Sequence, residues 1–145
     1  MKRWAELTTD ELYSLLKLRT DVFFLEQRID ETELDDRDRE PTTVHYFMQD
    51  AAGTAAYLRT LVDAAPSHRD ASHLVGRVVV RADRRGEGLA QELMQRALAD
   101  LAGHAVILHS QAYIAPLYAK LGFEPFGEVY QEAGIPHLSM YRAAR

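Results

Sequence analysis

Apolar residues recur along the chain with helical spacing in some stretches and with strand-like character in others. Between residues 9 and 24 they stand three or four positions apart, at Leu12, Leu15, Leu16, Val22 and Phe23. This spacing predicts an amphipathic helix, and the preceding threonines, followed by two acidic residues, are typical of a helix start. Residues 4–7 are expected to form a short first strand.

Three β-rich runs follow in the middle of the chain. Residues 43–49 and 54–62 flank the turn-forming residues 50–53, which predicts a hairpin. Residues 74–81, with the sequence LVGRVVVR, are rich in β-branched valine and form the clearest strand of the sequence. The polar segment between the second and third runs is expected to be a loop.

The second half of the chain alternates helical and strand patterns. Apolar residues at helical spacing predict a helix from Leu89 to about residue 102, and the apolar run 105–109 suits a buried strand. A second, short helix is expected to begin near Ile114 or Ala115, because the proline that follows is tolerated only in a first helical turn.

Gly122 is the expected end of that short helix. Residues 123–129 and 138–142 are the last strand candidates, separated by residues 131–136. The order of elements predicts an α+β fold, an α/β three-layer arrangement around a mixed sheet. The length of 145 residues suits one domain, taken as residues 1–145.

Composition narrows the class of protein. The chain has no cysteine, so disulfides, thiolate metal sites and an acyl-cysteine intermediate are excluded. The six histidines show no metal-ligand spacing, and no metal is expected. A formal charge of −5 argues against a nucleic-acid partner. The sequence begins without an apolar signal region and contains no membrane-spanning run, so we expect a cytoplasmic protein with no membrane partner.

Residues 30–40, DETELDDRDRE, carry seven acidic residues and two arginines. Charge runs usually lie in water, so a solvated loop is the first interpretation. The alternative is that part of this segment borders a site for a cationic substrate.

A glycine-rich turn between the valine strand and the Leu89 helix is the most informative stretch. A helix N-terminus offers unpaired N–H groups and a partial positive charge, which together bind phosphate. Gly86 and Gly88 let the backbone approach an anion, and Arg84 and Arg85 can add charge-assisted hydrogen bonds. The alternative is an ordinary turn with surface arginines. The glycines fit neither a P-loop nor a Rossmann fingerprint.

The chain here resembles the GNAT acetyltransferases. Their [QR]-x-x-G-x-[GA] signature corresponds to residues 85–90, RGEGLA, and their Tyr-x-x-x-Gly-Phe ending corresponds to Tyr118, Gly122 and Phe123. Two further stretches, residues 18–27 and 132–142, resemble the ElaA subgroup. Many GNAT proteins have asparagine where this chain has Gln111. The resemblance implies a mixed, mostly antiparallel central sheet with helices on both faces.

The resemblance also implies roles on the side of the acyl donor, acetyl-CoA. The backbone of Val78, Val79 and Val80 should face the pantetheine arm. The pyrophosphate should be held by the glycine-rich turn and its arginines, and Gln111 should lie beside the cofactor. Tyr118 should protonate the departing thiolate. The alternative for Tyr118 is a structural role as an aromatic side chain of the core. The turn residues implied are Arg84, Arg85, Gly86, Gly88, Leu89 and Ala90.

The acceptor side is less well marked. Glu26, in a stretch that faces the acceptor cleft in ElaA-like chains, is the leading candidate for the general base, with Gln27 beside it. His109 is a second candidate for the base, and Ser110 and His137 are expected to contact the acceptor. For Glu26 and both histidines, a purely structural role is the alternative.

These features predict an acetyl-CoA-dependent N-acetyltransferase acting on a primary amine of a small molecule or polypeptide. The alternative is a non-catalytic acyl-CoA-binding sensor or interaction module of the same fold. A phosphotransfer domain is disfavoured because no Mg²⁺-binding residue follows the turn. A homodimer is possible.

Overall fold

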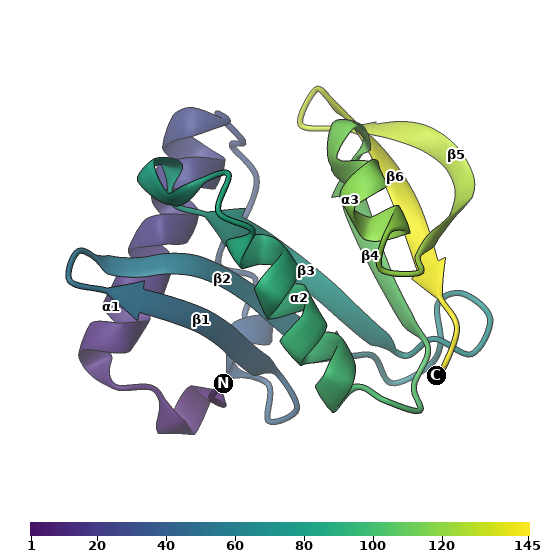
Figure 1. The fold of residues 1–145 in the computed structure, drawn as a ribbon, viewed down its shortest axis with the longest axis horizontal. Coiled ribbons are helices and arrows are strands. Elements are labelled where there is room, and N and C mark those ends of the chain that lie inside the picture. Colours follow the sequence, from purple (N-terminus) through teal and green to yellow (C-terminus); the bar gives the residue numbers. More distant parts are fainter.

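The computed structural model describes all of residues 1–145, which form one six-stranded sheet with helices on both of its faces (Figure 1). The strands are β1 (Val44–Asp50), β2 (Gly53–Val62), β3 (His73–Val80), β4 (Val106–Gln111), β5 (Glu124–Glu132) and β6 (Ile135–Arg142). The main helices are α1 (Thr9–Arg19), α2 (Leu89–Asp100) and α3 (Ala115–Ala119). These elements confirm the predicted α+β fold.

The sheet has the order β1-β2-β3-β4-β6-β5, and only the β3–β4 pair is parallel. That pair is short, because residues 73–75 of β3 meet only residues 106–108 of β4. Beyond these positions the two strands diverge, as Figure 1 shows. The sheet is therefore mixed and mostly antiparallel, as expected, and it splits at its centre.

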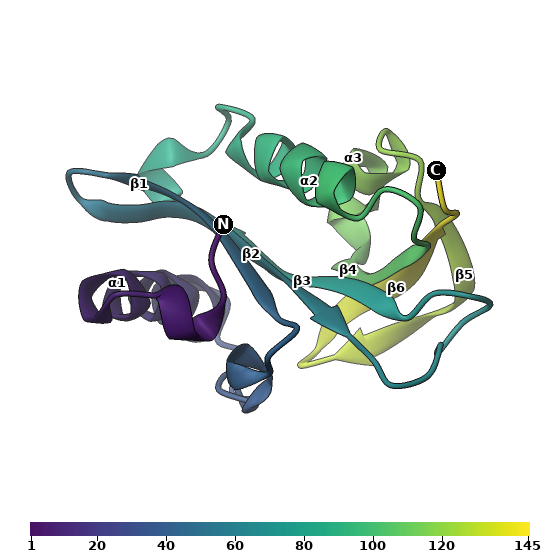
Figure 2. The ribbon, with the colours of Figure 1, turned by 90° about the horizontal axis from the view of Figure 1, so that it is seen from below.

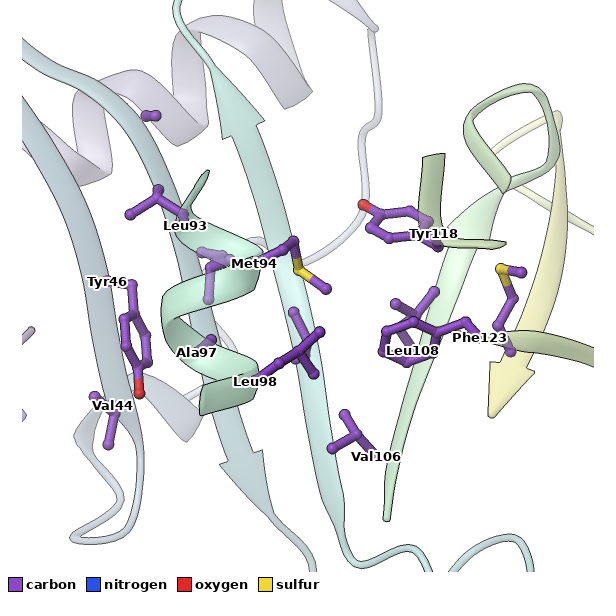
Figure 3. Packing of buried hydrophobic residues seen from close by; sticks show 14 of the residues in the cluster. Val44, Tyr46, Leu93, Met94, Ala97, Leu98, Val106, Leu108, Tyr118 and Phe123 are labelled. Carbon is purple, nitrogen blue, oxygen red and sulfur yellow. The ribbon is translucent and has the colours of Figure 1, made fainter. Parts of the chain in front are cut away.

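Helix α1 covers one face of the sheet, and α2 and α3 cover the other (Figure 2). Leu15 and Leu18 of α1 pack against Tyr57 and Val79. On the opposite face, α2 buries residues 93, 94, 97 and 98 against the sheet (Figure 3), which is the apolar stripe that its sequence predicts. These two apolar clusters, on opposite faces of the sheet, fix the three-layer arrangement.

The N-terminal region corrects two predictions. Residues 4–7 are not a strand: Trp4–Glu6 is a short 3₁₀ helix, η1, and only Lys2 forms an isolated bridge to His45. The first helix does not end at residue 24 but continues beyond α1 as a π-helical segment, η2 (Thr20–Glu26). Such segments are rare and are frequent at functional sites.

The C-terminal hairpin is tighter than predicted. Residues 131–136 are not a loop, because β5 extends to Glu132 and β6 begins at Ile135. Ala133 and Gly134, both with positive φ, make the two-residue turn that this geometry requires. The short helix α3 begins at Ala115 and has Pro116 in its first turn, as predicted. None of the helices is long and apolar enough to cross a bilayer.

Candidate active site

A cavity of about 380 Å³ lies where β3 and β4 diverge. It is lined from both faces of the sheet, because side chains alternate along β4. Leu108 belongs to the core under α2 and α3, so His109 and Gln111 point to the opposite face, where Gln111 bonds to Gln27. Tyr118 reaches the cavity from α3. The opening therefore connects the two faces of the sheet.

The strand β3 presents an unpaired edge to this opening. Val79 and Val80 pair with β2 on their other side, and a bulge at Arg77 and Val78 interrupts that ladder. Beyond Val75 no strand pairs with β3 on the side of β4. The backbone of Val78–Val80 thus has an edge without a partner strand, as a strand-like ligand needs, and the oxygen of Val80 there accepts from Arg85 Nε at 3.2 Å.

The glycine-rich turn lies between β3 and α2. Gly86 and Gly88 have φ of +82° and +78°, which disfavour other residues, and open space lies where their side chains would stand. The backbone N–H groups of residues 85–88 donate to no acceptor in the chain, and no side chain caps the first turn of α2, which contains Leu89 and Ala90. These donors fit a diphosphate, which would fill the open space and accept their hydrogen bonds.

Both arginines of this turn already have carboxylate partners. Arg84 contacts Asp50 at 2.7 Å and Glu87 at 2.8 Å. Arg85 makes a two-pronged pair with Glu26, at 2.7 and 2.8 Å. The pair joins two residues for which the sequence predicted separate roles, one with the cofactor and one as the base.

Glu26 does not line the cavity, and its position is a poor one for a base. The hydrogen bond from Arg85 lowers the pKa of Glu26, which keeps its carboxylate ionised and weakly basic. By contrast, the cavity is lined by Gln27, Ser110 and His137.

Tyr118 lies at the junction of the core and the cavity. Its ring packs edge-on against Phe123 and only 5% of the residue is exposed. Its hydroxyl makes no hydrogen bond within the chain, and Figure 3 shows it directed toward the gap between β3 and β4. Burial raises the pKa of Tyr118 to about 12. At neutral pH the phenol is therefore protonated and can donate a proton into the cavity.

On the α1 side of the sheet, polar side chains of β4 and β6 lie together. His109 Nδ1 is 2.9 Å from Ser139 Oγ, and burial lowers the pKa of His109. Ser110, whose side chain points to the α2 and α3 face like that of Leu108, is buried and donates to the backbone oxygen of Gln111. His137 stands directly opposite Gln111 in the β4–β6 ladder. The sequence predictions for the acceptor side, other than Glu26, are thus brought to one place.

The acidic segment 30–40 is not simply a solvated loop. Asp38 is buried between Arg19 (2.8 Å) and Arg59 (2.9 Å). Burial alone would raise the pKa of Asp38, but the hydrogen bonds and charges of the two arginines outweigh it and lower the pKa. Glu33 pairs with Arg19 and with Arg77 of the β3 bulge. This arginine network fixes the segment as a wall of the cavity, with residues 31–33 in the lining.

Several lining residues were missed at the level of sequence. Arg59 and Arg77 are charged residues inside strands, a signal that could have marked a buried ionic network. Tyr130 and Glu132 reach the cavity from β5, but the sequence predicts the end of a strand and a loop for their segment.

No group of three or more histidine or acidic residues is arranged to hold a metal ion.

Comparison with known proteins agrees with this geometry. The sequence profile of the acetyltransferase (GNAT) domain matches residues 20–143. The chain is 36% identical to the protein ElaA of Escherichia coli over 143 residues, which cover 95% of this chain and 91% of ElaA. A UPF0039 protein of Mycobacterium tuberculosis is 35% identical over 141 residues, covering 96% of this chain and 89% of that protein.

Solved structures give the same result. An acyl-CoA N-acyltransferase from Pseudomonas aeruginosa superposes with a TM-score of 0.88 at 39% identity, covering 98% of this chain and 96% of that chain. The crystal structure of Escherichia coli ElaA gives a TM-score of 0.87 at 34% identity, covering 97% and 96%. The resemblance inferred from the two signatures is confirmed, and the chain belongs to the GNAT acetyltransferase family.

Proposed function

We propose that this protein transfers an acyl group, with acetyl-CoA as the donor, to a primary amine of a small molecule or polypeptide. The observation that carries the proposal is the split between β3 and β4. On one face of the split stand the open amides of the glycine-rich turn and the Tyr118 hydroxyl. On the other face stand His109, Gln111 and His137.

The donor side is a set of preformed hydrogen-bonding groups. The amides of residues 85–88 and the first turn of α2 would hold the diphosphate. The unpaired edge of β3 at Val78–Val80 would bond to the pantetheine amides as a strand does. When bound, acetyl-CoA supplies a thioester whose carbonyl carbon is open to attack. Arg85 would turn from Glu26 to the diphosphate.

The reaction is direct attack of a neutral amine on the thioester carbonyl, so the C–N bond forms and the C–S bond breaks. The Tyr118 hydroxyl would give its proton to the departing sulfur, and the nitrogen loses a proton in the same exchange, which restores the phenol. A phenol with a pKa near 12 stays protonated until the thiolate needs its proton. The relative from Pseudomonas aeruginosa, described as an acyl-CoA N-acyltransferase, supports this reaction class.

The test is a thiol-release assay with acetyl-CoA, and with longer acyl-CoA donors, across a panel of primary amines. Turnover with any amine supports the enzyme. Binding of acetyl-CoA by calorimetry without turnover across the panel would favour the sensor alternative. No binding would refute both.

Tyr118→Phe tests the acid directly. We expect turnover to fall by about 100-fold, the usual contribution of general acid catalysis, while acetyl-CoA affinity stays within about twofold. Tyr13→Phe, at an exposed position of α1 outside the cavity, is the matched control. Unchanged turnover in Tyr118→Phe would remove the acid role.

A further inference from the structure

The imidazole of His137 is held in one tautomer by the backbone. Its Nδ1 lies 2.7 Å from the carbonyl oxygen of Ile135. A carbonyl oxygen only accepts, so Nδ1 carries the hydrogen and the lone pair of the neutral ring lies on Nε2. His137 is buried, yet it lines the cavity. The ring is therefore oriented as a proton acceptor.

A carboxylate stands beside that lone pair. Glu132 Oε2 lies 3.4 Å from His137 Nε2, longer than a normal hydrogen bond. When the imidazole is neutral, Nε2 of His137 and Oε2 of Glu132 are both hydrogen-bond acceptors. A ligand group with several N–H donors can bond to both of them. A primary ammonium is such a donor, since it can bond to both atoms at once. The turn between β5 and β6 thus provides a binding position for a cationic amine.

We propose that His137 is the general base of the acceptor site and that Glu132 binds the acceptor's ammonium beside it. The inference rests on the proposed acyltransfer. His137 Nε2 takes one proton from the ammonium, which leaves a neutral amine to attack, and the proton then passes to solvent. The second proton of the nitrogen returns to Tyr118 after its hydroxyl has protonated the departing sulfur.

The position of His137 suits this step. In the β4–β6 ladder it faces the same side of the sheet as Gln111, opposite the face from which Tyr118 enters. The base and the acid therefore enter the cavity from opposite faces of the sheet, which would suit a base on the acceptor's side and an acid on the donor's side.

Two other candidates fit less well. Glu26 is not among the residues that line the cavity, whereas His137 is. His109 bonds to a hydroxyl of Ser139, which can donate or accept, so its tautomer is not fixed. His109 also has no carboxylate within ion-pair distance.

The charged and titratable groups around His137 come from three directions. Glu132 and Tyr130, whose ring lies 5.7 Å away, belong to β5. His109 belongs to β4, and Glu31 and Glu33 line the cavity from the acidic segment. Glu33 is paired with arginines, so Glu31 and Glu132 are the carboxylates left to attract an ammonium.

The experiment compares two kinds of amine in the wild type and in His137→Gln. A primary alkylamine that turns over is charged at neutral pH and needs a base; methoxyamine is already neutral. We expect His137→Gln to lose about 100-fold in kcat/KM for the alkylamine at pH 7. This loss should shrink as the pH rises, because more of the alkylamine is then already neutral. With methoxyamine, kcat/KM should change little. His104→Gln, outside the cavity, is the matched control.

Equal losses with both amines, or an unchanged pH profile, would overturn the assignment. Because His137→Gln can perturb the hairpin, Glu132→Gln at an exposed position is the second variant. It should raise KM for the alkylamine, leave kcat nearly unchanged and leave the kinetics with methoxyamine as in the wild type. A KM for the alkylamine equal to that of the wild type would exclude Glu132 as the ammonium site. Acetyl-CoA affinity is measured in the wild type and in each variant. If the wild type neither binds acetyl-CoA nor acylates any amine, the proposed function fails. If it does both and only the results expected of the variants are absent, the assignment of His137 and Glu132 fails.

Discussion

The substitution Glu26→Gln separates two roles that this side chain could have. If Glu26 were the base, the change would lower turnover. If its role is to hold Arg85, the change frees the arginine for the diphosphate. Both side chains are more than 40% exposed, so their pair is worth about 0.2–1 kcal/mol. Since 1.4 kcal/mol is tenfold in affinity, acetyl-CoA should bind up to about fivefold more tightly.

The assay is isothermal titration of acetyl-CoA, followed by steady-state kinetics with the best acceptor. Arg85→Gln should weaken binding by about tenfold or more, since a hydrogen bond to a charged group is worth about 1.5–3 kcal/mol. Asp21→Asn removes the same charge from a different exposed pair, with Lys17, and controls for net charge. A tenfold loss of turnover in Glu26→Gln with unchanged acetyl-CoA affinity would refute this reasoning and restore Glu26 as the base.

Two predictions concern the ionic network behind the cavity. Asp38→Asn leaves Arg19 and Arg59 with only Glu33 and Asp35, and should lower the free energy of unfolding by about 3 kcal/mol; a loss under 1 kcal/mol in urea denaturation would contradict this. The second prediction concerns the loss of stability at acidic pH. Burial opposes the ionisation of Asp35, but hydrogen bonds and charge from Arg59 lower its pKa to about 2. Because the folded pKa lies below the unfolded value of about 3.9, this stability is present above about pH 4 and is lost toward pH 2. Its size is about 2 kcal/mol, and Asp35→Asn should reduce the slope of stability against pH in that range.

Much of the fold follows from local sequence. The apolar stripe of α2, the valines of β3 and the glycines before α2 act within a few residues of one another, so their consequences can be read from short stretches. The start of α3 at Ala115 follows from the single proline in its first turn. Where local signals were weak, as in residues 4–7 and 131–136, the predicted elements were wrong.

The open glycine-rich turn and the place of Tyr118 in the short helix α3 could be predicted for the same reason: each belongs to a short motif that its own residues mark. The pairing of Glu26 with Arg85, the burial of Asp38 and the contact of His137 with Glu132 could not. The first two depend on how elements distant in sequence are aligned, and the third on the tight β5–β6 turn at Ala133 and Gly134, where the sequence had predicted a loop. A charged side chain carries no local signal of its partner, so only the tertiary structure decides whether it meets solvent, an opposite charge or the cavity.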